Sequence, residues 1–286
     1  MMTFFYARAA PFALLPAWCV YFNEDLIREY PFFLISWAAI MNIKDSGITL
    51  TSFLLRPSKR KLIREARKLR NLKGLEIGGP SSLFSIRGYF PVYLFANLDG
   101  VNFSTDTVWE GSIKEGHHYR SHRKTGHQFI CEATDLGKIS NASYDFILSC
   151  HSLEHVANPL KALEEWSRVL KPGGKLILVL PDKNHTFDKN RPYTTFDHLL
   201  KDYVAGTGES DESHFEEIIS CLVPGPHTNA NKIREDLSQN ALRRVAHHHV
   251  FDWELISQML AHFSFQITFR QTCSPFHLVT IAEKMN

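Results

Sequence analysis

The run His-Ser-Leu-Glu-His at residues 151–155 holds two imidazoles and a carboxylate within five positions. On an α-helix, His151 and His155 would lie one turn apart on the same face, with Glu154 beside them. Two histidines in this spacing bind Zn²⁺ in the inverted zinc-protease signature, where the glutamate serves as general base. Whether this chemistry applies depends on the elements that surround the motif.

A second group of candidate residues lies further along the chain. If their segments are helical, His198 and Asp202 share one face, and His214 and Glu217 share another. Brought together, these side chains could bind a divalent metal or supply a base that deprotonates a substrate hydroxyl. Solvated helix faces are the alternative, so we assign no metal ligands from the sequence.

Three consecutive histidines and one arginine complete the candidates. The side chains of His247–His249 point in different directions, so they do not readily hold one ion together. We select His248 as the one that faces a pocket, with local packing as the alternative. Arg191 could clamp a substrate carboxylate or phosphate.

The composition is that of an ordinary globular protein. The 286 residues, 44% hydrophobic and 22% charged, suffice for one large domain with additions. A net charge of +2 offers no excess to neutralise many phosphates, so we expect no nucleic-acid partner. The cysteines show no CxxC spacing, which is typical of reduced thiols in a cytoplasmic protein.

The N-terminal residues are unusually apolar. Residues 9–22 and 31–41 carry no charge, but each run is shorter than the roughly 20 residues of a spanning helix. No basic region precedes them, which disfavours a signal peptide. We treat residues 1–57 as a helical extension that packs on the domain or, through residues 1–41, rests on a membrane surface. It could also be dispensable, with the working chain beginning near Met41.

Short apolar runs alternate with helical patterns after this extension. We expect strands at 72–77, 91–98, 127–131, 144–150 and 175–181, a helix over 158–171 and a last helix over 252–263. Asn158-Pro159 marks the start of the first helix, and Lys-Pro-Gly-Gly at 171–174 ends it. Two further runs, FQITFRQ and FHLVTIAEK, have the pattern of a strand pair. The alternation indicates a parallel sheet covered on both faces.

Residues 72–181 resemble a class I S-adenosylmethionine-dependent methyltransferase. The matching stretches are LEIGG, then EATDL at 132–136, then SYDFILSCHSLEHVANPLKALEEWSRVLKPGGKLILVLP at 143–181. The resemblance implies an α/β, Rossmann-like, doubly wound sheet of seven mostly parallel strands, the last one antiparallel. S-adenosylmethionine would lie across the carboxyl ends of the strands. Residues 58–286 would be the methyltransferase domain, and residues 182–250, after strand five, a helical insertion in the position of a substrate lid.

This arrangement changes the meaning of the His-Ser-Leu-Glu-His run. His151 would come directly after a strand, and the next helix would start only at Asn158. His151 and His155 would then not share a helical turn, so a zinc protease is disfavoured.

The resemblance implies cofactor contacts where the first two strands end. Glu76 would hold the methionine amino end through loop backbone and water, or only orient the glycine loop. Gly78 and Gly79 would let the backbone approach the ligand, although Pro80 and Ser82 stand where the common Gly-x-Gly-x-Gly pattern has glycines.

Asp99 would accept hydrogen bonds from both ribose hydroxyls as the acid that closes the second strand. Asn102 is the alternative residue for this role. A turn-forming aspartate is the alternative function for Asp99.

The third and fourth strands would supply the remaining contacts. Glu132, Ala133 and Asp135 match the stretch that flanks adenine. Ser149 and His151 would lie beneath the sulfonium, and His155 would cover the cofactor. As catalytic groups we select His214, His198 and His151, with packed, hydrogen-bonded histidines as the alternative.

These residues predict an enzyme that transfers a methyl group to a small-molecule or glycan acceptor, on oxygen, by in-line displacement. A non-catalytic binding protein on the same scaffold is the alternative, because the glycine loop departs from the common pattern. A nucleic-acid or protein methyltransferase is less favoured, since no Asn-Pro-Pro-Tyr-type tetrapeptide follows strand four. The sequence identifies neither the acceptor nor the oligomeric state.

Overall fold

The computed structural model describes residues 47, 57–222 and 230–285. The predicted apolar extension, residues 1–57, lies outside the described residues apart from Gly47 and Pro57. Among the helices of the described ranges, none is long and apolar enough to cross a membrane.

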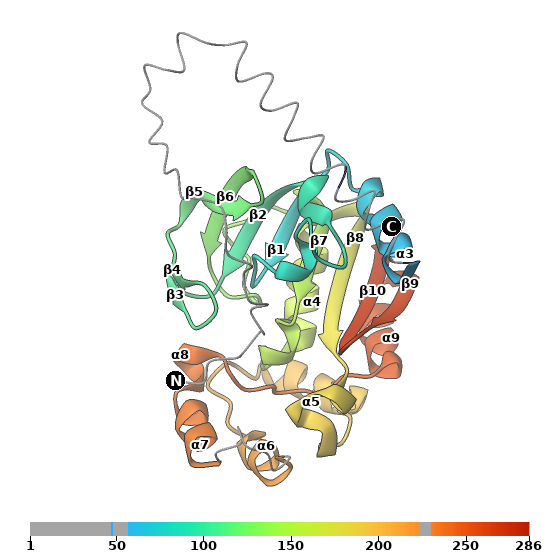
Figure 1. Cartoon of the computed structure of the whole chain (residues 1–286). Coiled ribbons are helices and arrows are strands. Elements are labelled where there is room, and N and C mark those ends of the chain that lie inside the picture. The colour runs from blue at the N-terminus through green and yellow to red at the C-terminus, as the bar shows by residue number, and fades with distance from the viewer. Residues whose placement is uncertain (1–46, 48–56, 223–229, 286) are drawn as a thin grey trace, which may run out of the picture. The chain divides into compact units, whose positions relative to one another are not determined.

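A sheet in the order β5-β6-β2-β1-β7-β8-β10-β9 forms the centre of the domain (Figure 1). Its parallel strands are β1 (Lys73–Ile77), β2 (Asn97–Asn102), β6 (Lys124–Ile130), β7 (Tyr144–Cys150) and β8 (Leu170–Pro181). β10 (His277–Lys284) runs antiparallel to both of its neighbours, β8 and β9 (Phe265–Cys273). This confirms the predicted doubly wound sheet with a reversed last strand.

The predicted sheet is extended by an eighth strand. β5 (Gly116–Ser121) pairs antiparallel with β6 and forms the edge of the sheet. Between β2 and β5 lies a separate small ribbon of β3 (Asp106–Thr107) and β4 (Gly111–Ser112). This part of the chain was predicted without strands, because its polar residues show no apolar alternation.

The second strand lies later in the chain than its predicted range, 91–98. Residues Val92–Leu94 form a 3-10 turn, η3, and β2 begins only at Asn97. The side chains of Val92, Tyr93 and Phe95 are buried in one cluster with α3 (Arg60–Lys68). The apolar run therefore covers a face of the sheet instead of joining it.

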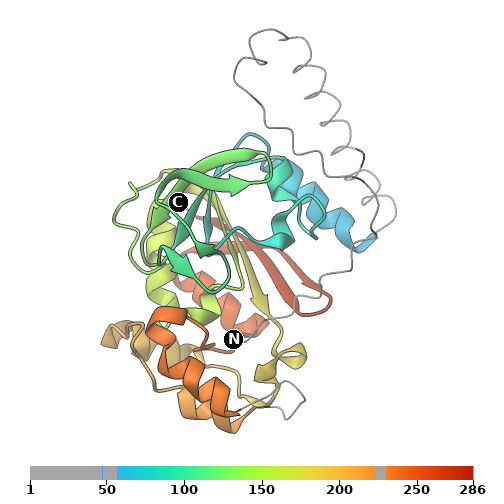
Figure 2. The same cartoon turned by 60° about the vertical axis from the view of Figure 1, so that its left-hand side comes forward.

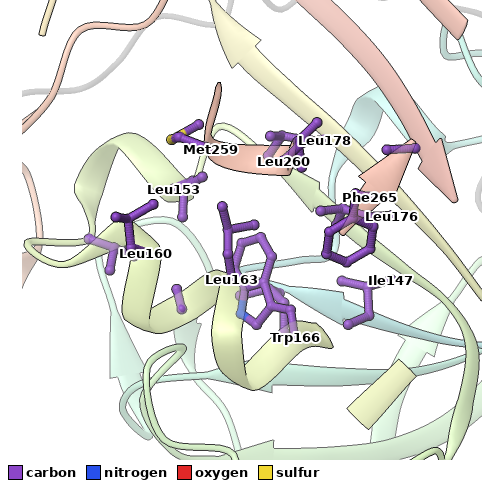
Figure 3. Packing of buried hydrophobic residues seen from close by; sticks show 14 of the residues in the cluster. Ile147, Leu153, Leu160, Leu163, Trp166, Leu176, Leu178, Met259, Leu260 and Phe265 are labelled. Atoms are coloured by element: carbon purple, nitrogen blue, oxygen red, sulfur yellow. The ribbon is translucent and has the colours of Figure 1, made fainter. Parts of the chain in front are cut away.

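The two predicted helices, α4 (Pro159–Val169) and α9 (Trp253–His262), both cover one face of the sheet (Figure 3). The Asn158 side chain accepts a hydrogen bond from Lys161 N and begins α4, with Pro159 in its first turn. Trp166 of α4 is fully buried in the same cluster as Ile147 and Leu176 of the strands. The opposite face is covered by α3, the 3-10 turns η1 (Pro57–Lys59) and η2 (Ser82–Phe84), and η3.

The segment between β8 and α9 consists of short helices, as predicted for residues 182–250. They are η5 (Lys183–His185), η6 (Phe187–Asn190), α5 (Phe196–Ala205), α6 (Phe215–Ser220), α7 (Ala230–Ser238) and α8 (Asn240–Arg243). Thr195 caps the start of α5, and Gly206, with a φ of 65°, ends it. The helices gather beyond the end of the sheet at which β8 terminates (Figures 1 and 2). We call residues 182–250 the insertion.

Candidate active site

A tight glycine turn follows β1 at the carboxyl edge of the sheet. Gly78 has a φ of 74°, and a Cβ atom there would lie 2.3 Å from Ser152 Oγ. Ser152 Oγ in turn donates to the carbonyl of Ile77 at 3.1 Å. The glycine turn and the loop after β7 are therefore in direct contact, so the two predicted cofactor segments meet.

Glu76 is fully buried behind this turn. Its carboxylate accepts hydrogen bonds from the Tyr93 hydroxyl at 2.9 Å, the Tyr119 hydroxyl at 2.6 Å and Ser81 N at 2.9 Å. Burial raises the pKa of Glu76 to about 7, although these three donors favour the charged form. A Cβ on Gly79 would lie 2.3 Å from this carboxyl group. Glu76 thus orients the glycine turn, which is one of the two roles that the sequence left open.

Asp99 does not close the second strand, so its predicted position is wrong. β2 continues to Asn102, and Asp99 pairs with Leu75 in the middle of β1. Its carboxylate accepts hydrogen bonds from Tyr144 Oη at 2.7 Å and His127 N at 2.8 Å. Asn102, the alternative residue, is the one at the strand end.

Asn102 also connects β2 to the glycine turn. Its amide nitrogen donates to the carbonyl of Gly79 at 2.9 Å, and its side-chain oxygen accepts from Trp109 Nε1 at 3.3 Å. Asn102 therefore joins the carboxyl end of β2 to the glycine turn, which Asp99 does not reach.

The three residues predicted to flank adenine follow β6, as expected. Glu132 pairs with Arg244 of the insertion at 2.7 Å, and the carbonyl of Ala133 accepts from Trp166 Nε1 at 3.0 Å. The side chain of Asp135 accepts from Gly137 N in a local turn. Only Glu132 of the three has a side chain directed toward the insertion, and no sequence pattern predicted its partner Arg244.

Ser149 lies near the carboxyl end of β7, beside the glycine turn. It pairs with Ile77, the residue before the glycine turn, and its side chain is fully buried. Its hydroxyl has no hydrogen-bond partner among the described residues. A buried hydroxyl costs free energy unless a partner satisfies it, so Ser149 lacks a stabilising contact at this end of β7 within the described ranges.

The histidines of the His-Ser-Leu-Glu-His run turn to different partners. His151 follows β7 directly with a φ of 51°, and its Nε2 lies 2.8 Å from His277 Nδ1. His155 Nδ1 instead lies 3.0 Å from the carbonyl of Ala246. Burial lowers the pKa of His155 to about 4. The run forms a 3-10 turn, η4 (Leu153–His155), so the two imidazoles do not share a helical face.

Glu154 faces His151 from within this turn. One carboxylate oxygen lies 3.3 Å from His151 Nδ1, and the residue is 1% exposed. Burial by itself would raise the pKa of Glu154, but the hydrogen bond and charge of His151 lower it below its ordinary value. A buried carboxylate of this kind fixes the ring orientation of the histidine.

The insertion brings together three of the four residues that the sequence singled out. His198 Nε2 lies 3.2 Å from Asp202 Oδ2 and 3.3 Å from His214 Nε2. Glu217 is not part of this group, because its carboxylate accepts from Arg191 Nε at 2.8 Å. Its place is taken by His249, whose Nε2 lies 3.7 Å from Asp202 Oδ2.

Arg191 is 1% exposed and serves the insertion itself, so the predicted substrate clamp is wrong. Its guanidinium donates to Glu217, Asp188 and the carbonyls of His247 and His248. Asp188 also lies 2.6 Å from His247 Nδ1. Burial would lower the pKa of His247, but the Asp188 carboxylate raises it above the ordinary value.

His248, the residue selected from the triple histidine run, has no exposed surface and contacts Asn240 at 3.2 Å. That selection is wrong, and His249 is the residue that reaches the other candidates. The run itself was the only sequence signal for this group, and it did not distinguish its members.

Several hydrogen bonds join the insertion to the strand ends. Arg244 contacts Glu132 and also Glu209, and Glu209 accepts from Ala157 N at 3.3 Å. Asn158 Nδ2 donates to the carbonyl of Asp202 at 3.0 Å. The insertion therefore lies against the loops that follow β6 and β7.

Comparisons with known proteins concern mainly the strand region of the chain. A family model described as a methyltransferase domain matches residues 89–178. A highly reducing polyketide synthase of Emericella nidulans is 38% identical over 109 residues, which cover 31% of this chain and 4% of that protein. The chain thus spans a small fraction of the curated relative it matches.

Two solved structures illustrate the structural matches. A protein from Pyrococcus horikoshii aligns with 15% identity over 80% of this chain and 88% of its own, with a TM-score of 0.47. A 1,6-didemethyltoxoflavin-N1-methyltransferase of Burkholderia thailandensis aligns with 14% identity over 96% and 93% of the two chains, with a TM-score of 0.43. The fold assignment rests on the strand order given above, not on these similarities.

The domain match covers the β7-α4-β8 region that carries Ser149, His151 and Glu154. The strand order around it has the reversed last strand of the class I fold. Residues 89–178 therefore match a methyltransferase domain within a sheet of class I strand order, and S-adenosylmethionine is the cofactor of such a domain.

Proposed function

We propose that the protein transfers the methyl group of S-adenosylmethionine to a hydroxyl of a small-molecule or glycan acceptor. The observation that carries this proposal is the place of the insertion. It leaves the sheet at the end of β8 and contacts the loops after β6 and β7, beside the candidate cofactor residues. An insertion in this position bounds a space for a small acceptor and excludes water from it.

Residues at the carboxyl edge of the sheet would each contact a different part of the cofactor. The glycine turn at 78–79, braced by Glu76, would let backbone groups approach the methionine end. Asn102 and Glu132 follow neighbouring strands and would contact the ribose and adenine. Ser149 would satisfy its buried hydroxyl against the ligand. When bound, the cofactor supplies an activated methyl group, so the protein has to align the acceptor and accept its proton.

We assign the proton-accepting role to His151. The anionic Glu154 faces its Nδ1, which favours a proton on Nδ1 and a lone pair on Nε2. His277 contacts that Nε2, and burial lowers the pKa of His277 to about 4, so His277 is neutral at pH 7. In this assignment the acceptor hydroxyl takes the place of His277 at Nε2 and gives its proton to the His151 ring, while Glu154 stabilises the resulting charge.

Calorimetry with S-adenosylhomocysteine tests the cofactor half of this proposal. Gly78→Val should weaken binding more than about 100-fold, because the side chain would meet Ser152 and strain a left-handed backbone. Gly208→Ala in the insertion is the matched control, since nothing lies within 4 Å of the added atom. No binding by the unmodified protein would refute the proposal and favour a non-catalytic scaffold.

The acceptor half requires a search for product. The protein, incubated with methyl-labelled S-adenosylmethionine and a cell extract, should label a small molecule or glycan that mass spectrometry identifies. Label found only on protein or nucleic acid would contradict the proposed acceptor class while leaving methyl transfer intact.

A further inference from the structure

Four side chains from three separate segments of the insertion converge on one point. His198 and Asp202 lie on α5, His214 directly precedes α6, and His249 lies shortly before α9. One ligand atom from each of the four lies within 4.8 Å of the others. Residues so far apart in the sequence do not meet by local geometry alone, so the fold itself assembles this group.

The separations between these atoms match those around a tetrahedral metal ion. With Zn–N and Zn–O distances of about 2.0–2.2 Å, ligand atoms of a tetrahedron lie about 3.3–3.6 Å apart. His198 Nε2 lies 3.2 Å from Asp202 Oδ2 and 3.3 Å from His214 Nε2. One ligand atom of His249 lies within 4.8 Å of a ligand atom of each of the other three residues. An ion would fit with small side-chain movements.

The hydrogen bonding of the group is incomplete without an ion. Asp202 Oδ2 is buried and has no hydrogen-bond partner among the described residues. The Nε2 atoms of His198 and His214 face each other, and at most one proton can bridge them. Three imidazoles around one carboxylate oxygen offer lone pairs that a cation would satisfy together.

The surroundings supply the outer contacts that metal ligands usually make. Asp202 Oδ1 accepts a hydrogen bond from Thr207 Oγ1 at 3.2 Å. His249 Nε2 lies 3.1 Å from the carbonyl of Ala157, while its Nδ1 has no hydrogen bond among the described residues. One nitrogen of this ring can therefore bind the ion while the other is protonated.

We propose that His198, Asp202, His214 and His249 bind one divalent transition-metal ion of the zinc type. Three imidazoles and one carboxylate suit zinc better than magnesium or calcium, which prefer oxygen ligands. Four protein ligands make a closed, structural site. The ion joins α5, the start of α6 and the segment before α9, and His198, which is half-exposed, lies on its route of entry.

A second group, Glu154, His155 and His247, also satisfies the spacing of a metal site. Its nitrogens already have partners, because His247 Nδ1 contacts Asp188 at 2.6 Å and His155 Nδ1 contacts the carbonyl of Ala246 at 3.0 Å. We therefore assign the ion to the group in the insertion.

The test uses the purified full-length protein, stripped with a chelator and then titrated with Zn²⁺. We expect one equivalent to bind, and Co²⁺ in its place to give the intense visible absorption of a tetrahedral site. The double variant His198→Ala/His214→Ala should lose this equivalent, and Asp202→Asn should bind more than about 10-fold more weakly. His185→Ala, at an exposed histidine of the same insertion, is the matched control and should bind normally.

Circular dichroism and S-adenosylhomocysteine binding establish that each variant is folded, so loss of metal is not mistaken for unfolding. Failure of the wild-type protein to bind stoichiometric Zn²⁺ or Co²⁺ would overturn the proposal. So would an equivalent that survives in His198→Ala/His214→Ala but disappears in His151→Ala/His155→Ala. Because these measurements need no acceptor, they are independent of the proposed methyl transfer.

Discussion

The glycine turn and the insertion hold their buried charges in different ways. In the turn, Glu76 meets only neutral donors, two tyrosine hydroxyls and one backbone N–H, and burial raises its pKa to about 7. In the insertion, Asp188 meets the Arg191 guanidinium and the raised-pKa imidazole of His247. The first arrangement tolerates a proton on the acid, whereas the second requires that the acid stay charged.

This difference separates the roles of the two regions. A turn held by neutral hydrogen bonds can keep its shape over a range of pH. An insertion held by buried ion pairs depends on every partner being present, because an isolated charge left in the interior is costly.

Arg191→Met should produce the largest effect, confined to the insertion. It removes the partner of buried Asp188 and the donor to two backbone carbonyls, so we expect a loss of about 3–5 kcal/mol in the free energy of unfolding. Urea denaturation measures this. Adding Asp188→Asn to Arg191→Met should restore part of the lost stability. If Arg191→Met is as stable as the wild type, the insertion does not depend on this buried ion pair.

His151→Ala should lower kcat about 100-fold, the scale of a lost general base, with little change in S-adenosylhomocysteine affinity. Glu154→Gln, which keeps the shape and removes the charge, should cause a smaller loss. Single-turnover kinetics with the identified acceptor check both. If His151→Ala turns over normally while His214→Ala does not, the base lies in the insertion.

Asn102 and Asp99 give a finer test of the cofactor side. Asn102→Ala should weaken S-adenosylhomocysteine binding by about 1–2 kcal/mol, since it removes the bond to the Gly79 carbonyl at the carboxyl edge. Asp99→Asn should leave this affinity nearly unchanged and instead lower thermal stability, because its partners are Tyr144, His127 and Lys73. Calorimetry measures both affinities. If Asp99→Asn weakens S-adenosylhomocysteine binding more than Asn102→Ala does, Asp99 is the residue that contacts the ribose.

The last expected effect is a change in the pH dependence of stability. Glu76 has a folded-state pKa of about 7, above its ordinary value of 4.5, so the folded protein binds this proton more tightly than the unfolded chain. Stability should therefore decline as pH rises from about 4.5 to about 7. Glu76→Gln, which cannot ionise, should flatten this decline in urea titrations, and an unchanged slope would mean that Glu76 is charged throughout.

The sequence predicted the part of the fold that is determined by local patterns. β7 and the start of α4 occur where the apolar run and the Asn158-Pro159 cap placed them. β2 was misplaced because the apolar run at 91–95 packs on a face of the sheet, a choice that depends on α3 and not on periodicity. β5 was missed because only Tyr119 and Ser121 of its side chains are buried.

The candidate site was predictable only where it lies within a single motif. Glu76, Gly78 and Ser149 belong to strand ends whose order follows from the fold. Tyr119, Arg244 and His249 come from segments whose positions depend on long-range packing, and a spacing rule cannot bring them together.

The additional strand β5 also affects how copies of the protein can meet. Without β5, the unpaired backbone N–H and C=O groups of β6 could pair with a strand of another molecule, which is a common route to aggregation. β5 occupies that edge and is itself short, with His117, His118 and Arg120 exposed. Short edge strands that carry bulky polar or charged side chains are poor templates for pairing with another strand. This edge of the sheet therefore disfavours aggregation at high protein concentration.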